Sequence, residues 1–151
     1  MILYIEDLLR EVNIKNWYLG EARKKADNDA VFVQSDADAQ DILLYRLRQA
    51  VVSVLQMANN NRVVFTCDYK DDALVFAISP IRQGREHLLG LLKESIRLFL
   101  VEEIRLLWMM NTKPEWADAT MREELIANIR QAMNDVTFGE KVRRRCAIMG
   151  I

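Results

Sequence analysis

The sequence IRLFLVEEIRLLWMM, residues 96–110, is the most apolar part of the chain, with 11 hydrophobic residues among 15. Its four charged residues are Arg97, Glu102, Glu103 and Arg105. In a helix, which turns by about 100° per residue, these charges point to about 0°, 140°, 240° and 80° and leave no single polar face. A helix that is apolar on nearly every side lies at the centre of a fold or is covered by a partner subunit. We therefore expect one of these two roles for the helix, which we predict over about 82–110.

A β-hairpin is predicted immediately before this helix. The segments 62–69 and 73–79 are rich in β-branched and aromatic residues, and Lys70-Asp71-Asp72 lies between them. This pattern indicates a hairpin over 62–79 with a turn of three to four residues, ended by Pro80. Because a lone hairpin is marginal in water, it must pack on a helix or find a third strand.

Two helices are predicted before the hairpin. The first covers about 4–25, with its apolar face formed by Ile5, Leu8, Leu9, Val12 and Leu19, while Ile14, Trp17 and Tyr18 broaden its apolar surface. The second begins after Ser35, a good N-cap, and ends at the run Asn59-Asn60-Asn61, since Asn tolerates the left-handed conformation. Its buried stripe is Leu43, Leu44, Leu47, Val51, Val54, Leu55 and Ala58.

A fourth helix begins near Pro114 or at Thr120, where Thr120-Met121-Arg122-Glu123 matches a capping box. Its expected buried stripe is Met121, Leu125, Ile129, Ala132 and Val136. Residues 137–151 form a different, basic and apolar C-terminal arm. The alternation of residues 142–149 could add a strand to the hairpin, in its own subunit or in a neighbour.

The fold class that follows is α-rich α+β: a bundle of about four helices with one β-hairpin between helices two and three and a C-terminal arm. A length of 151 residues fits one domain, with the bundle over 1–136 and the arm over 137–151. The 21 Lys and Arg residues nearly balance the 22 Asp and Glu residues, for a net charge of −1. Bulk charge therefore favours neither nucleic acid nor an anionic membrane as a partner.

No motif for catalysis, a cofactor or a metal is recognisable. Cys67 and Cys146 have no CxxC spacing, so we expect two reduced thiols and no zinc site. His87 is the only histidine and has no partner at a recognisable spacing. Neither Glu102 nor Glu103 has a histidine three residues later, which excludes the di-iron pattern. We expect a protein that is not an enzyme and that has no catalytic, cofactor or metal site.

The location expected from the sequence is the cytoplasm, or a virion assembled there. The N-terminal segment lacks the basic region of a signal peptide, and its apolar run is short. Charges at Glu102, Glu103 and Arg105 interrupt the most apolar stretch, whereas a membrane span needs about 20 residues with few charges.

The order of segments resembles the small head–tail connector, or neck, proteins of tailed phages and prophages. The likeness consists of helices through Asn61, the hairpin over 62–79, and then helices and the arm over 137–151. It implies a non-enzymatic ring subunit between portal and tail. Because the likeness is one of architecture, it transfers no functional residue.

The function expected first is a protein–protein interaction or assembly subunit that binds itself or another protein. The expected interface residues are Phe99, Leu100, Leu107, Trp108, Met109, Ile148 and Ile151. One alternative is a nucleic-acid-associated regulator whose Arg143, Arg144 and Arg145 contact phosphates. Another is a small-molecule-binding helical protein with a pocket lined by Trp108 or Trp116 and polar groups such as Glu103 or His87.

Overall fold

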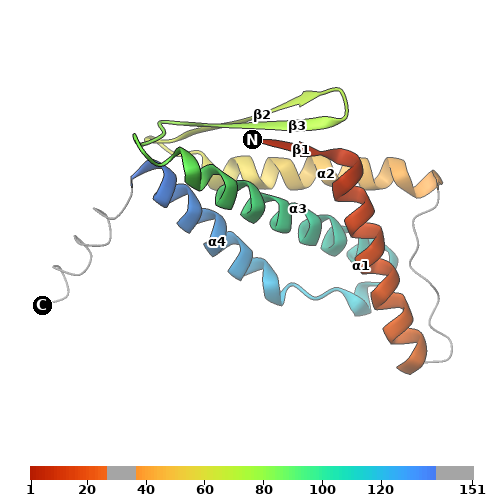
Figure 1. Cartoon of the computed structure of the whole chain (residues 1–151). Coiled ribbons are helices and arrows are strands. Elements are labelled where there is room, and N and C mark those ends of the chain that lie inside the picture. The colour runs from red at the N-terminus through yellow and green to blue at the C-terminus, as the bar shows by residue number, and fades with distance from the viewer. Residues whose placement is uncertain (27–36, 139–151) are drawn as a thin grey trace, which may run out of the picture.

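The computed structural model describes residues 1–26 and 37–138, which form a sheet layer on a helix layer (Figure 1). The strands are β1 (Ile2–Tyr4), β2 (Val64–Lys70) and β3 (Ala73–Ser79). The long helices are α1 (Ile5–Ala26), α2 (Ala37–Ala58), α3 (Leu89–Thr112) and α4 (Thr120–Thr137). Short 3-10 helices cover Glu86–Leu88 and Pro114–Trp116. The described residues confirm an α-rich α+β fold with a hairpin between the second and third helices.

The sheet is antiparallel, with strand order β1-β3-β2. The hairpin register runs from Val64 opposite Ser79 to Lys70 opposite Ala73. Its turn therefore contains only two residues, which corrects the expected three to four. Asp71 takes a φ of 49° in this turn, a conformation that Asp tolerates better than most residues with a side chain.

The third strand is β1, at the N-terminus, where Ile2–Tyr4 pairs with residues 73–75 of β3. The ladder continues at Met1, whose amino group donates to the Phe76 oxygen at 2.7 Å and whose oxygen accepts from the Phe76 N–H at 2.7 Å. Three residues are too few to show a period of two, so the sequence did not identify this strand. Residues 142–149, which were considered for such a strand, lie outside the described part of the chain.

The end of α2 depends on the side chain of Asn59 and not on a left-handed backbone. The Asn59 amide donates to the Leu55 oxygen at 2.9 Å and to the Phe65 oxygen at 2.8 Å. Its Oδ1 accepts from the Phe65 N–H at 2.8 Å. Asn59 thus joins the last turn of α2 to the start of strand β2. Ser35, the expected N-cap of this helix, lies outside the described residues.

The start of α3 differs from the prediction, whereas α4 begins at Thr120, one of the two expected positions, without the expected capping box. The helix α3 starts at Leu89, seven residues after the expected Arg82, which instead donates its N–H to the Val136 oxygen at the end of α4. In α4 the capping box does not form, because the N-cap is Ala119 and the Thr120 N–H bonds to Asp118 Oδ1 at 2.9 Å. Met121 was expected inside but is exposed, whereas Ile126 and Met133 are buried.

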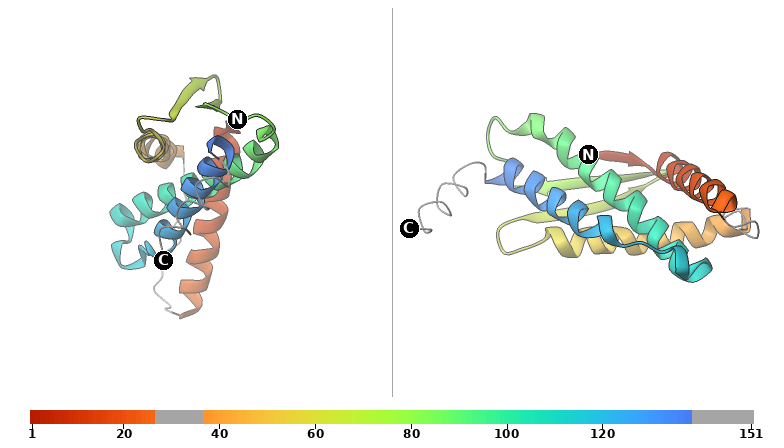
Figure 2. Two further views of the ribbon diagram at one scale, coloured as in Figure 1. Left: turned by 90° about the vertical axis from the view of Figure 1, so that its left-hand side faces the viewer. Right: turned by 90° about the horizontal axis from the view of Figure 1, so that it is seen from below.

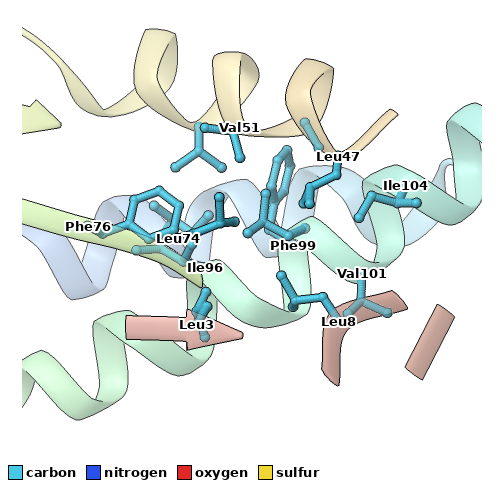
Figure 3. Close-up of a cluster of buried hydrophobic side chains, with 14 of the residues drawn as sticks. Leu3, Leu8, Leu47, Val51, Leu74, Phe76, Ile96, Phe99, Val101 and Ile104 are labelled. Carbon is cyan, nitrogen blue, oxygen red and sulfur yellow. The ribbon is translucent and has the colours of Figure 1, made fainter. Parts of the chain in front are cut away.

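The core surrounds α3, which packs on α1, α2 and α4. Figure 3 shows Phe99 of α3 between Leu47 of α2 and Leu8 of α1. The inner face of the sheet closes the core from the other side through Leu3, Leu74, Phe65 and Phe76, and the two phenyl rings stack at 5.5 Å. In the described ranges 1–26 and 37–138, no helix is long and apolar enough to cross a membrane.

Candidate interaction surface

The apolar excess of α3 is covered by the chain itself. Of the residues expected at an interface, Phe99, Leu100, Trp108 and Met109 are 1%, 0%, 7% and 3% exposed, and Leu107 is half-buried. The neighbouring helices and the sheet provide this burial, so these side chains need no partner to leave water. Of the two roles considered for α3, the described chain places it at the centre of the fold.

The charged residues of α3 lie on two sides of the helix, one facing α1 and the other facing α4. Toward α1, Glu102 accepts from Lys15 at 2.7 Å and from Arg105 at 2.6 Å, and Arg97 pairs with Glu11. Toward α4, the buried Glu103 accepts from Arg122 at 2.8 Å and 3.2 Å. This arrangement explains how the helix is central while having no single polar face.

Two of the ion pairs of α3 shift the pKa of a member from its ordinary value. The hydrogen bond that Arg122 donates to Glu103 holds the pKa of Arg122 above its ordinary value. The Arg97 guanidinium lowers the pKa of Glu94, to which it donates at 2.6 Å and 2.9 Å. Each of the carboxylates Glu94, Glu102 and Glu103 therefore has a cation as its partner, which suits a structural role more than proton transfer.

The large apolar side chains that remain in water include a row on the outward side of α1. Ile14, Trp17 and Tyr18 are 48%, 43% and 63% exposed, and the two rings meet edge to face at 5.1 Å. Ile2 and Tyr4 of β1 are also exposed. We call the line formed by Asp7, Arg10, Ile14, Trp17 and Tyr18 the α1 outer stripe. Trp and Tyr exposed in this way are typical of protein interfaces.

A groove of about 430 Å³ lies beside the first half of this stripe, between α1, β1 and α3. Its apolar lining includes Ile2, Tyr4 and Ile14. Its charged residues are Asp7, Arg10, Glu11, Lys93, Glu94 and Arg97. Asp7 accepts from Arg10 at 2.7 Å, and the groove is lined by both positive and negative groups. We call this hollow the α1 groove.

The expected small-molecule pocket is only partly formed. Trp116 lines a cavity of about 220 Å³ with Glu102 and Arg105, which is below the usual range for drug-sized ligands. Trp108 is buried in the core, and His87 is exposed on a short 3-10 helix. Glu103 forms an ion pair with Arg122. The four residues named for the pocket therefore do not converge on one site.

The described residues hold no group of three His, Cys, Asp or Glu side chains that could bind a metal ion. Cys67 is a free thiol, half-buried on the inner face of the sheet. Burial, together with the charge of Asp68, raises its pKa from 9.0 to about 11. At neutral pH it is therefore a thiol and a poor nucleophile.

The residues predicted for the C-terminal arm, namely Arg143, Arg144, Arg145, Cys146, Ile148 and Ile151, lie outside the described part of the chain. The α1 outer stripe was missed as a site, although the sequence carries a signal for it. Ile14, Trp17 and Tyr18 lie about 100–160° from the centre of the face formed by Leu8, Val12 and Leu19, at about 100° per residue. Apolar residues opposite a predicted buried face indicate a second contact surface.

Comparison with protein-family models, with curated proteins and with solved structures gives no match for this chain. The meaning of the α1 outer stripe therefore has to come from its own residues.

Proposed function

We propose that this chain is a non-enzymatic assembly subunit that binds a second copy of itself through the α1 outer stripe. The observation that supports the proposal is the exposure of Ile14, Trp17 and Tyr18 on one helix face, beside a groove. A Trp–Tyr pair loses little conformational freedom on binding and supplies a large contact area. The pairing of the charged residues on α3 supports a non-enzymatic role, because these carboxylates already have partners.

The test is the absolute mass of the full chain by light scattering on a sizing column at two concentrations. We expect the wild type to form a multimer, and the double variant Trp17→Ala/Tyr18→Ala to need at least about tenfold more protein to associate, since each aromatic anchor contributes about 1–2 kcal/mol or more. Circular dichroism melting checks that both proteins are folded.

A matched control lies on α2, where Ile42 and Tyr45 are 48% and 56% exposed. The double variant Ile42→Ala/Tyr45→Ala removes a similar apolar area from a different face and should associate like the wild type. A monomeric wild type, or an equal loss of association in the two double variants, would contradict the proposal.

Two finer predictions stay predictions. A place in a ring between the portal and tail of a phage particle rests on segment order alone. A nucleic-acid contact through Arg143, Arg144 and Arg145 rests on residues that the structure does not describe.

A further inference from the structure

The α1 outer stripe has two unlike ends. Its first half, at Asp7 and Arg10, borders the α1 groove, whereas its second half ends in the Trp17–Tyr18 ring pair. Ile14 lies four residues from Arg10 and four from Tyr18, or about 6 Å along the axis in each direction. Ile14 therefore marks the centre of a line with a hollow at one end and a projection at the other.

The inner side of α1 packs on its own chain as far as Gly20. Figures 1 and 2 show the last turns of α1 extending beyond the layer formed by α3 and α4. The buried hydrophobic residues of α1 are Leu8, Leu9 and Val12, but Asn16 and Gly20 are also buried and Leu19 packs against the core. A second chain could therefore lie along the outer side of α1, where Ile14, Trp17 and Tyr18 are exposed, without meeting the other described helices.

We infer that two copies pair α1 against α1, antiparallel and crossing at Ile14, so that the Trp17–Tyr18 pair of each copy lies on the α1 groove of the other. The inference rests on the proposed self-assembly and adds the geometry of the contact. A two-fold axis at Ile14 brings residue 10 of one copy opposite residue 18 of the other, and the same contact then forms twice.

Charge selects the antiparallel arrangement over the parallel one. In a parallel pair centred on the same residue, Arg10 would lie opposite Arg10 and the ring pairs would face each other, with both grooves empty. In the antiparallel pair each Arg10 lies near a Tyr18 or Trp17 ring, which attracts a guanidinium through its π face. Asp7 then lies toward Glu21, but crossing helices diverge away from the central residue, so this repulsion is weak.

The decisive experiment is disulfide crosslinking of Ile14→Cys in a Cys146→Ser background. A residue on the two-fold axis meets its own copy, so mild oxidation should give a covalent dimer of most of the protein. The control is Ile42→Cys, on α2, where the native side chain has the same exposed fraction of 48%. This control and the Cys146→Ser parent, which both keep Cys67, should stay uncrosslinked under the same conditions.

A second experiment separates the two helix orientations. We expect Arg10→Glu to weaken the wild-type association about tenfold, and a mixture of Arg10→Glu with wild type to associate with intermediate strength. If the helices were parallel, the mixture would associate more tightly than either protein alone, because Glu would then face Arg. That result would overturn the inference.

Failure of the inference is distinct from failure of the proposed function. A multimeric wild type whose Ile14→Cys variant gives no covalent dimer would overturn the α1 pairing and leave self-assembly standing. A wild type that is monomeric at both concentrations would overturn both, and would mean that another part of the chain, or a different protein, covers the stripe.

Discussion

The helices α1 and α3 both carry more apolar residues than one helix face can hold, but they resolve the excess differently. In α3, residues such as Ile96, Phe99 and Ile104 are buried, because neighbours surround the helix and its charges are paired along two lines. In α1, Trp17 and Tyr18 remain in water on the side away from the core. An apolar excess in a sequence thus shows that a helix needs a cover, and only the fold shows whether its own chain supplies it.

The largest expected loss of stability comes from a substitution in the central helix α3. We expect Phe99→Ala to lower the free energy of unfolding by about 3–5 kcal/mol, because a 1%-exposed ring is lost and a cavity remains. Trp17→Ala removes a larger ring from the surface of α1 and should change the stability of the monomer by no more than about 0.5 kcal/mol. Urea unfolding at low protein concentration measures both. A similar loss for the two variants would mean that α1 is as enclosed as α3.

The two lines of charge on α3 should also differ. Arg122→Ala leaves the carboxylate of Glu103, which is 6% exposed, without its partner, and we expect a loss of about 1–3 kcal/mol. Lys15→Ala breaks the pair with Glu102, whose side chain is 20% exposed and which keeps Arg105, so we expect about 0.2–1 kcal/mol.

The same unfolding curves test this difference. Raising the salt concentration to 1 M should reduce the effect of Lys15→Ala more than that of Arg122→Ala, because water and ions screen the more exposed pair. Equal losses of stability, or a larger loss for Lys15→Ala, would contradict the view that the side of α3 facing α4 is less accessible to water than the side facing α1.

Much of the fold was predictable because long helices repeat their signal. The stripe of α2, from Leu43 to Ala58, recurs over several turns, and so does the alternation in the hairpin. Short or local features were not predictable. The strand β1 has only three residues. Thr120 does not form the predicted capping box because its N–H donates to Asp118 instead. Which residue accepts a given hydrogen bond depends on backbone position, which composition and spacing do not encode.

The candidate surface was less predictable than the fold. The sequence marked residues 96–110 as the place for a partner, since it showed the apolar excess without the neighbours that cover it. Ile14, Trp17 and Tyr18 were visible as a broadening of the first helix, but the more apolar stretch outweighed them. Deciding between the two required knowing that α3 contacts three helices, which is a property of tertiary packing.

The smallest expected effect is a difference in thiol reactivity between the inner, covered face of β2 and its outer, open face. Cys67 points to the helices, and at pH 8 its pKa of about 11 leaves about a hundredfold less thiolate than an ordinary value of 9.0. The greater nucleophilicity of a more basic thiolate offsets this by about tenfold, so iodoacetamide should react about tenfold more slowly in Cys146→Ser than at an open site.

The open site is Thr66→Cys in a Cys67→Ala/Cys146→Ser background, because Thr66 is exposed on the outer face of the sheet. The Cys67 rate should keep rising up to about pH 11, whereas the rate at the outer site should level near pH 9. Equal reaction rates and equal pH profiles at the two sites would contradict this prediction. They would mean that the inner face of β2 is as accessible to water as the outer face.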